Sequence, residues 1–229
     1  MIIVYIDSME DTSTFARVYE GLDDCTLLIN PNRSEVEKIL TEQPTETLLC
    51  FGHGTPYGLF DEKLQTYLID SNSLPLLKQR EMIGIWCYAA TFGERNGLRG
   101  FFTDMFISNR NECIWNRCGY YSDEEIFVEN EKFAVRINTL IKEGTPIEDW
   151  TSTFVDECNS DLEFVSFNYT GMTYLYGNER IYSASDMEYS EEDEVITFPK
   201  GWTFADEMRY LGIDEELFGA PDEGTTEDE

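Results

Sequence analysis

Short apolar segments alternate with amphipathic segments along most of the chain, and this alternation limits the available folds more than any other feature. Residues 1–6 (MIIVYI) form a continuous run rich in β-branched side chains, which is typical of a strand buried on both faces. Similar runs predict further strands at residues 25–29, 47–51, 82–86 and 113–116. The segments between them predict helices at residues 7–20, 34–40 and 73–80.

The later part of the chain continues the same pattern. Residues 123–142 place apolar side chains on one helical stripe, and Gly144 predicts where that helix ends. We expect another helix at residues 146–157 and one or two strands at residues 164–176. Because strands joined by crossovers of this length pair in parallel, the pattern predicts an α/β fold, a three-layer sandwich with a mainly parallel central sheet.

One helix start carries a local signal of its own. Ser34 is followed three residues later by Glu37, which is the spacing of a capping box, so we expect the helix at residues 34–40 to begin at Ser34.

Composition excludes several classes of function. The 229 residues include 46 Asp and Glu against 16 Lys and Arg, which gives a formal net charge of −30. Such a surface repels phosphate groups, so we expect no nucleic-acid partner and no anionic membrane surface as a partner. No apolar run is long enough to span a bilayer, and no basic leader precedes the first strand, so we expect a cytoplasmic protein. The six cysteines form no CxxC pair and are interpreted as free thiols in a reducing compartment.

The charge is concentrated towards the end of the sequence. Residues 186–229 contain 16 acidic and 2 basic residues, a net charge of −14. We therefore divide the chain into an α/β domain at residues 1–185 and an acidic C-terminal extension at residues 186–229, the last residues of which we expect to be disordered. Two interpretations of this extension stay open. It could be a solvated tail, or it could be a regulatory segment that binds a protein partner or an ion.

Two residues whose side chains could take part in catalysis follow successive predicted strands. His53, the only histidine, stands between two glycines after the strand at 47–51, and Cys87 follows the strand at 82–86. If these strands are neighbours, both residues reach the carboxyl edge of the sheet, where an imidazole can activate a thiol nucleophile. The backbone N–H groups of Gly54 and Cys87 would then form an oxyanion hole. Taken singly, each residue has a plainer interpretation, as a turn histidine and as a buried small thiol.

Residues 48–89 (LLCFGHGTPYGLFDEKLQTYLIDSNSLPLLKQREMIGIWCYA) resemble the catalytic core of the caspase-like cysteine peptidases, which include caspases, metacaspases, clostripain, gingipains and CHAT domains. The shared pattern is a hydrophobic strand, His-Gly, an acidic loop (Asp61 or Asp70 here) and a strand that ends in Cys. Residues 97–127 and 174–178 extend the resemblance to about residues 1–180.

The resemblance implies a caspase-like (caspase-hemoglobinase-like) fold and a cysteine endopeptidase. His53 would act as general base and acid, Cys87 as nucleophile, and a thioester acyl-enzyme would form. Asp7 and Asp11 follow the first strand, where the family builds a wall of its substrate pocket; an acidic wall favours a basic residue before the scissile bond. Ile85 stands where relatives carry an acidic residue or Gln.

Two further hypotheses follow from the resemblance. Arg95 and Arg99 lie among three glycines after Cys87, which predicts an exposed basic loop and a candidate self-processing site. Several family members need calcium, so calcium is a candidate cofactor, although no EF-hand spacing is present and residues 191–194 (EEDE) are a charge run. We assign no metal ligands.

Two other classes of function stay open. The chain could be a catalytically inactive caspase-like module that binds a protein partner, because folds outlast their chemistry. It could also be an acidic mimic of nucleic acid that inhibits a basic partner. A nucleotide-binding domain fits less well, because the segment after the first strand is acidic and carries no glycine-rich loop.

Overall fold

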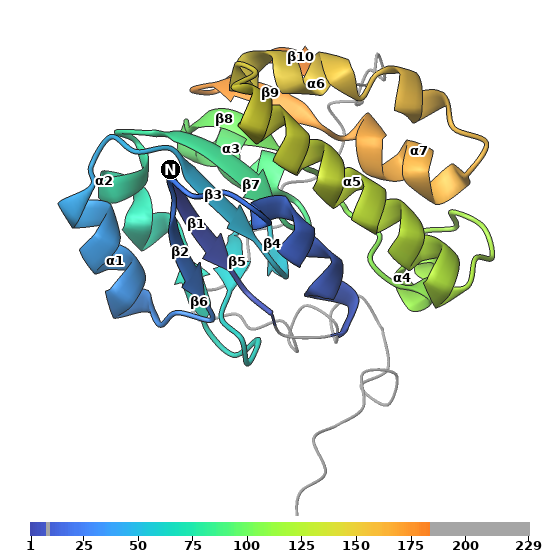
Figure 1. Ribbon diagram of the computed structural model, residues 1–229, viewed down its shortest axis with the longest axis horizontal. Coiled ribbons are helices and arrows are strands. Elements are labelled where there is room, and N and C mark those ends of the chain that lie inside the picture. The colour runs from blue at the N-terminus through green and yellow to red at the C-terminus, as the bar shows by residue number, and fades with distance from the viewer. Residues whose placement is uncertain (8–9, 184–229) are drawn as a thin grey trace, which may run out of the picture. The chain divides into compact units, whose positions relative to one another are not determined.

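A seven-stranded sheet forms the centre of the molecule, in the order β10-β9-β8-β7-β3-β1-β2 (Figure 1). The computed structural model describes residues 1–7 and 10–183, with side chains described for residues 1–7 and 13–181. The first five strands of the sheet in sequence order are parallel, and β9 pairs antiparallel with both β8 and β10, so β10 runs in the direction of the first five. They are β1 (Ile2–Tyr5), β2 (Thr26–Ile29), β3 (Leu48–Phe51), β7 (Glu81–Ile85), β8 (Arg99–Phe102), β9 (Thr173–Tyr176) and β10 (Glu179–Ser183).

A small antiparallel sheet follows β3. Its strands are β4 (Gly54–Thr55), β5 (Gly58–Phe60) and β6 (Tyr67–Ile69), in that order. They lead through η2 (Ser71–Ser73) into the short helix α2 (Leu74–Leu77).

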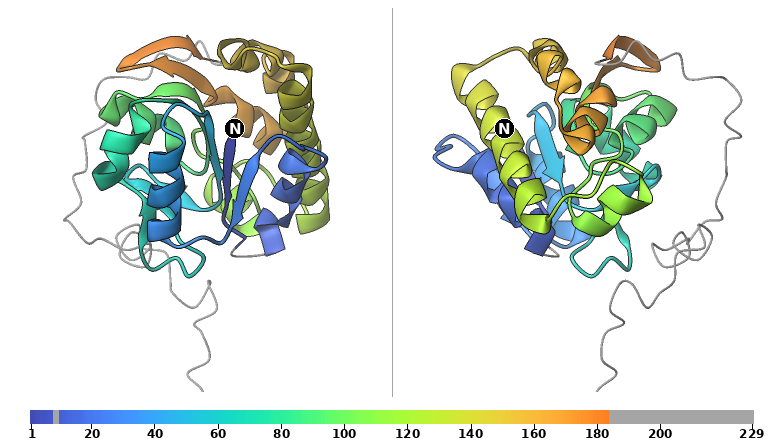
Figure 2. Two further views of the ribbon diagram at one scale, coloured as in Figure 1. Left: turned by 60° about the vertical axis from the view of Figure 1, so that its left-hand side comes forward. Right: turned by 90° about the vertical axis from the view of Figure 1, so that its right-hand side faces the viewer.

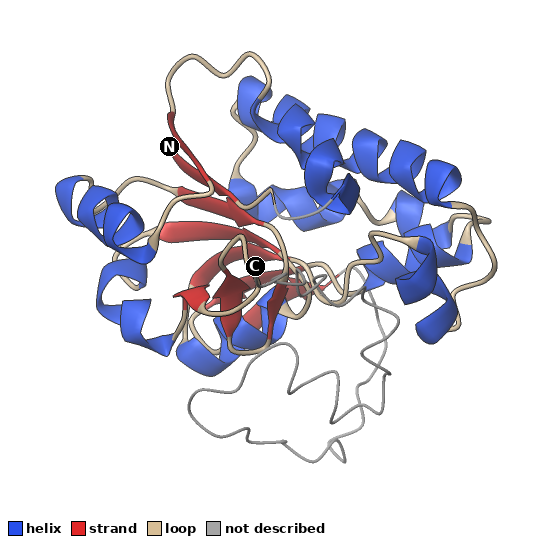
Figure 3. Ribbon diagram, turned by 90° about the horizontal axis from the view of Figure 1, so that it is seen from below, coloured by secondary structure: helices blue, strands red, loops and turns tan. Residues whose placement is uncertain are grey.

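Helices cover both faces of the central sheet (Figures 2 and 3). One face packs against the 3-10 helix η1 (Glu10–Tyr19) and the long helix α5 (Asp123–Glu143), together with α6 (Trp150–Thr153) and α7 (Glu163–Thr170). The other face packs against α1 (Arg33–Glu42), α2 and α3 (Ala89–Asn96). The remaining short helices are α4 (Arg110–Trp115), η3 (Ile147–Asp149) and η4 (Asp156–Asn159).

Alternation along the strands supplies both faces of the core. In β1, Ile3 and Tyr5 belong to the cluster beneath α5, whereas Ile2 and Val4 belong to the cluster beneath α1 and α3. All four side chains are at most 2% exposed. Burial of a large apolar side chain contributes about 1.5–3 kcal/mol, and a one-residue register slip would move every strand side chain to the wrong face. The two-sided burial therefore fixes the strand register that positions the site.

The predicted fold class is confirmed at the level of an α/β fold with a mainly parallel central sheet. The strands expected at residues 1–6, 25–29, 47–51 and 82–86 are present as β1, β2, β3 and β7. The helix expected at residues 123–142 is α5, which starts with a Ser122–Glu125 capping box and ends at Gly144 with φ 67°.

Three sequence predictions are wrong in detail. Residues 113–116 are not a strand but part of α4, which Asn109 caps by accepting a hydrogen bond from the Glu112 N–H. Most of residues 164–176 form α7, and only its end is a strand, β9. The α1 capping box uses Asn32 and Glu35 in place of Ser34 and Glu37, so the capping residue lies two positions earlier than expected and the helix begins at Arg33.

All described residues fall within one compact unit. The predicted acidic extension at residues 186–229, including EEDE at 191–194, lies outside the described residues. Among the helices of the described part, none combines the length and the apolar character that a bilayer crossing requires.

Candidate functional site

Asp7, His53 and Cys87 occupy equivalent positions after three neighbouring parallel strands. Tyr5 pairs with Phe51, and Phe51 pairs with Ile85, across β1, β3 and β7. Each candidate residue lies two positions beyond this row, and the Gly52 N–H extends the ladder with a 3.3 Å bond to the Ile85 carbonyl. The strand order thus brings the candidate base and the candidate nucleophile to the same edge of the sheet.

Trp86 packs the ends of these two strands together. Its side chain is 1% exposed, and its indole Nε1 donates to the Thr55 carbonyl at 3.3 Å. A Cβ atom on Gly54 would lie 2.2 Å from Trp86 Cδ1. The residue before Cys87 is therefore in direct van der Waals contact with the residue after His53, and only glycine fits at position 54.

Cys87 lies in the tight turn between β7 and α3. The next residue, Tyr88, is the N-cap of α3 and has a left-handed backbone (φ 64°, ψ 26°), a conformation that costs energy for a non-glycine residue. The half-buried Cys87 thiol donates to the Phe106 carbonyl at 3.6 Å. Its position just before an eight-residue helix places it where the helix dipole stabilises negative charge.

His53 lies directly before β4, the first strand of the small sheet. Its carbonyl accepts from the Phe60 N–H at 2.9 Å, and Gly54 pairs with Leu59. This pattern makes Gly54 and Leu59 a non-hydrogen-bonded pair, so the Gly54 N–H points away from β5. The His53 side chain is half-buried, with its Nε2 atom covered.

Asp7 lies on the opposite side of His53 from Cys87, because β1 is the neighbour of β3. Its carboxylate is exposed, and its backbone is fixed by Asn30, which accepts from the Asp7 N–H at 2.7 Å and donates to the Asp7 carbonyl at 3.2 Å. The side chain of Asp11 lies outside the part that the structure describes.

Other predicted site residues occupy different environments. Ile85, a candidate for substrate binding, is 1% exposed and packs in the core beneath α5. The expected flexible loop at Arg95 and Arg99 is wrong. Arg95 is in α3, over the ring of Tyr57 at 4.9 Å, and Arg99 is in β8, donating to the Tyr174 hydroxyl at 3.0 Å. The self-processing hypothesis therefore loses its structural premise.

The acidic residues of the motif loop have structural roles. Asp70 makes a two-point ion pair with Arg33 at 2.7 and 3.0 Å and caps η2. Asp61 accepts hydrogen bonds from the Lys63 and Gln65 N–H groups and from the Thr66 hydroxyl, which closes the turn before β6.

Three cysteines are buried, whereas Cys87 is half-buried. Burial raises the pKa of Cys50 far above its ordinary value, and burial is also the main cause of the pKa of about 11 at Cys118. Burial raises the pKa of Cys113 as well. Such thiols are poor nucleophiles at neutral pH.

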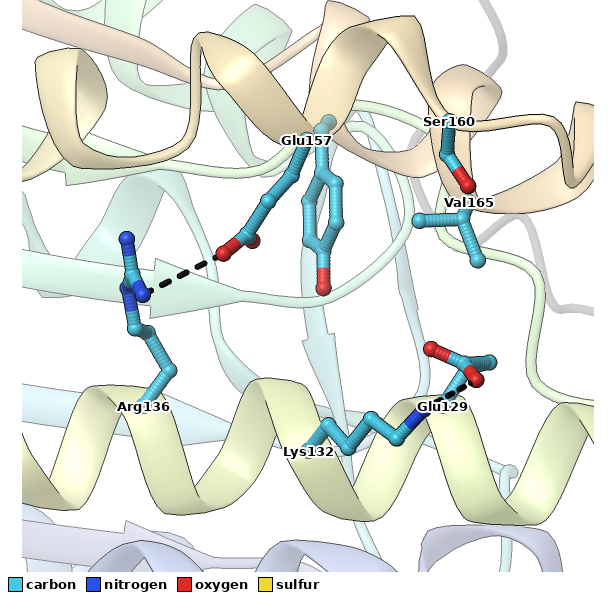
Figure 4. Close-up of a pocket in the computed structure, with 7 residues that line it drawn as sticks. Glu129, Lys132, Arg136, Glu157, Ser160 and Val165 are labelled. Carbon is cyan, nitrogen blue, oxygen red and sulfur yellow. Dashed lines mark hydrogen bonds and ion pairs between the residues drawn. The ribbon is translucent and has the colours of Figure 1, made fainter.

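A cleft of about 390 Å³ lies between α5, η4 and α7. Figure 4 shows Lys132 and Arg136 of α5 beside carboxylates: Lys132 pairs with Glu129 at 2.5 Å, and Arg136 pairs with Glu157 at 3.2 Å. Sequence reasoning missed this cleft, because its residues are spaced like any charged outer face of a helix. It contains neither His53 nor a cysteine, so it is separate from the candidate dyad.

The described residues offer no candidate metal site, and known proteins give no further guide to function. Within the described residues, no group of three or more His, Cys, Asp and Glu side chains could hold a metal ion. Comparisons with protein families, curated proteins and solved structures give no match. The strand order and the residues at the edge of the sheet are therefore the features from which a function can be inferred.

Proposed function

We propose that the chain is a caspase-like cysteine endopeptidase in which His53 and Cys87 form the catalytic dyad. The observation that carries the proposal is their equivalent position after the hydrogen-bonded neighbours β3 and β7, with Trp86 packed against Gly54. A thiol nucleophile needs a base within reach and a site that stabilises negative charge. The proposal assigns the first role to His53 and the second to the N–H groups of Gly54 and Cys87.

The proposed reaction has two steps. His53 takes the thiol proton as the Cys87 sulfur attacks the peptide carbonyl carbon, and the N–H groups of Gly54 and Cys87 stabilise the oxyanion. The C–N bond then breaks, and His53 gives the proton to the departing amine, which leaves a thioester. Water, deprotonated by His53, attacks the thioester; the C–S bond breaks, the carboxylic acid leaves, and the thiol is restored.

The position of Asp7 supports the proposal that the substrate carries a basic residue before the scissile bond. Its exposed carboxylate stands at the same edge, one strand beyond His53. A carboxylate at the rim of a substrate cleft attracts Arg or Lys and repels acidic side chains. Calcium as a cofactor stays a separate hypothesis.

A panel of fluorogenic peptides tests the proposal, with Arg, Lys, Asp, Asn or an apolar residue before the scissile bond, each with and without calcium. We expect cleavage after Arg or Lys, and a loss of about 10³-fold or more in Cys87→Ala and His53→Ala. The matched control is Cys25→Ala, which removes another half-buried thiol far from histidine and should retain full activity.

Two results would reject the proposal. One is cleavage that survives in Cys87→Ala. The other is a wild-type protein that cleaves none of the peptides and whose Cys87 resists iodoacetamide at neutral pH; that result would favour the partner-binding module instead.

A further inference from the structure

The segment after β8 supports the turn that carries Cys87. We call residues 103–107 the cysteine cradle. Thr103 donates its hydroxyl to the Trp86 carbonyl at 3.0 Å, and the Asp104 carbonyl accepts from the Tyr88 N–H at 3.1 Å. The Phe106 carbonyl accepts from the Cys87 thiol itself. The cradle contains no helix or strand, so its shape depends on what holds it from the other side.

Two buried asparagines hold that other side. The Ile107 N–H donates to Asn168 Oδ1 at 2.6 Å. The Ile107 carbonyl accepts from Asn130 Nδ2 at 3.1 Å and from Asn168 Nδ2 at 3.3 Å. Both asparagines are 2% exposed, Asn130 on α5 and Asn168 on α7. Two helices that are far from the sheet edge in sequence thus fix one residue of the cradle.

The link to Cys87 passes through a single peptide group. The Phe106 carbonyl that faces the thiol and the Ile107 N–H that faces Asn168 belong to the same planar trans peptide. Because this group is rigid, the direction of the N–H sets the direction of the carbonyl. Asn168 therefore determines, across one peptide plane, where the acceptor of the Cys87 thiol points.

We propose that Asn168, supported by Asn130, is a positioning residue for Cys87. Its amide oxygen holds the Phe106–Ile107 peptide so that the thiol is kept in one orientation at the edge of the sheet. The consequence for peptide hydrolysis rests on the function proposed above, whereas the consequence for the reactivity of the thiol does not.

Three variants test this in the full chain. Asn168→Ala removes every bond from the side chain of residue 168 to Ile107. Asn168→Asp keeps an oxygen for the Ile107 N–H, although a buried charge costs stability. Asn138→Ala is the matched control: Asn138 is a buried asparagine of α5 that donates to the Val18 and Glu20 carbonyls, away from the cradle.

The measurements are the rate of Cys87 alkylation by iodoacetamide, kcat and KM for the best peptide, and the free energy of unfolding. Asn168→Ala should change the alkylation rate and lower kcat about 10- to 100-fold with KM little changed, because small displacements of a nucleophile carry penalties of this size. Asn168→Asp should recover most of kcat in spite of its lower stability. Asn138→Ala should lose stability without any change in alkylation or kcat.

The proposal is overturned if Asn168→Ala and Asn138→Ala leave alkylation equally unchanged, or if kcat in all three variants simply follows stability. Failure of the dyad itself looks different. In that case Cys87→Ala still cleaves peptide, while the comparison of alkylation rates continues to decide the role of Asn168.

Discussion

At the residue scale, the candidate site depends on close contacts that leave no room for a larger side chain at position 54. A Cβ atom on Gly54 would meet the ring of Trp86 and would lie 2.6 Å from the Gly58 carbonyl oxygen. Trp86 cannot move away freely, because it is 1% exposed and its indole N–H is bonded to Thr55. The two strand ends that carry His53 and Cys87 are therefore held in a fixed relation by a glycine and an indole.

Gly54→Ala should disturb this relation. The added methyl group meets Trp86 and a backbone carbonyl, so we expect a loss of about 1–3 kcal/mol in the free energy of unfolding and a changed rate of Cys87 alkylation. Urea denaturation and iodoacetamide kinetics measure the two effects.

The matched control is Gly144→Ala at the end of α5. Gly144 has φ 67°, and a methyl group added there would have no atom within 4 Å. Only backbone strain of about 1–2 kcal/mol is therefore expected, with alkylation unchanged. Equal alkylation in both variants and the wild type would show that the contact with Trp86 does not shape the site.

At the scale of elements, α5 is the main support of one face of the sheet. Its N-terminus is fixed by the Ser122 hydroxyl, which accepts from the Glu125 N–H at 3.2 Å. In return, the Glu125 carboxylate accepts from the Ser122 N–H at 2.8 Å. Ser122→Ala should lower the free energy of unfolding by about 1 kcal/mol. Thermal or urea unfolding checks this, and Ser152→Ala, an exposed serine that caps no helix, should stay within about 0.5 kcal/mol of the wild type.

The Arg33–Asp70 pair ties α1 to the small sheet. Burial raises the pKa of Asp70, but hydrogen bonds from Arg33 and Asn72 outweigh it and leave the pKa below the ordinary value of 3.8. A depressed pKa stabilises the fold above the unfolded-state value, and this contribution is lost as the pH falls through the folded-state value. Asp70→Asn should therefore lower the free energy of unfolding by about 1–3 kcal/mol at pH 7. The difference in this free energy between the variant and the wild type should shrink below pH 3.8.

Urea unfolding of both proteins across this range of pH measures the effect. Glu37→Gln, which removes the more exposed partner of Arg33, should cost no more than about 0.5 kcal/mol. A difference for Asp70→Asn that does not depend on pH would show that the ion pair is not its cause.

The sequence predicted elements well where one signal dominated. The strands β1, β3 and β7 are continuous apolar runs, and their pairing puts His53 and Cys87 at the same edge of the sheet, as expected. It failed where packing overrode local preference: in α7, Phe164, Val165, Asn168 and Tyr169 are buried at helical spacing although the segment is rich in strand-forming residues. The loop predicted from three glycines after Cys87 contains the strand β8, and Gly100 lies within that strand. A Cβ on Gly100 would lie 1.8 Å from the Met82 carbonyl oxygen. That glycine permits close strand pairing.

The candidate site shows the same division. Pattern and strand order located His53, Gly54 and Cys87, because these positions depend on where strands end. The cradle and Asn168 could not be predicted, since they depend on a contact between residues 61 positions apart in the sequence.

At the scale of the whole molecule, the net charge of −30 is the dominant property. Repulsion among like charges opposes the compact state and is screened by salt. The urea midpoint should therefore rise between about 20 mM and 500 mM NaCl, a range over which the Debye length falls severalfold. A midpoint that is constant or falls with salt would contradict this expectation.

The same charge should guide substrates. If the proposed peptidase is active, kcat/KM for a basic peptide should exceed that for an acidic peptide of equal length, and the advantage should decrease with salt. Steady-state kinetics at the two salt concentrations measure it. An advantage that survives high salt would have to come from contacts within the site.

The indole of Trp86 also gives the molecule a built-in spectroscopic reporter. The chain has four tryptophans, and this one is bonded through its N–H to Thr55 and touches Gly54. In protein labelled with fluorotryptophan, its ¹⁹F resonance would record events at the dyad without a tag near the thiol. Alkylation of Cys87, the next residue in the chain, should shift that resonance and leave in place the signal of Trp150, which is buried against Phe101.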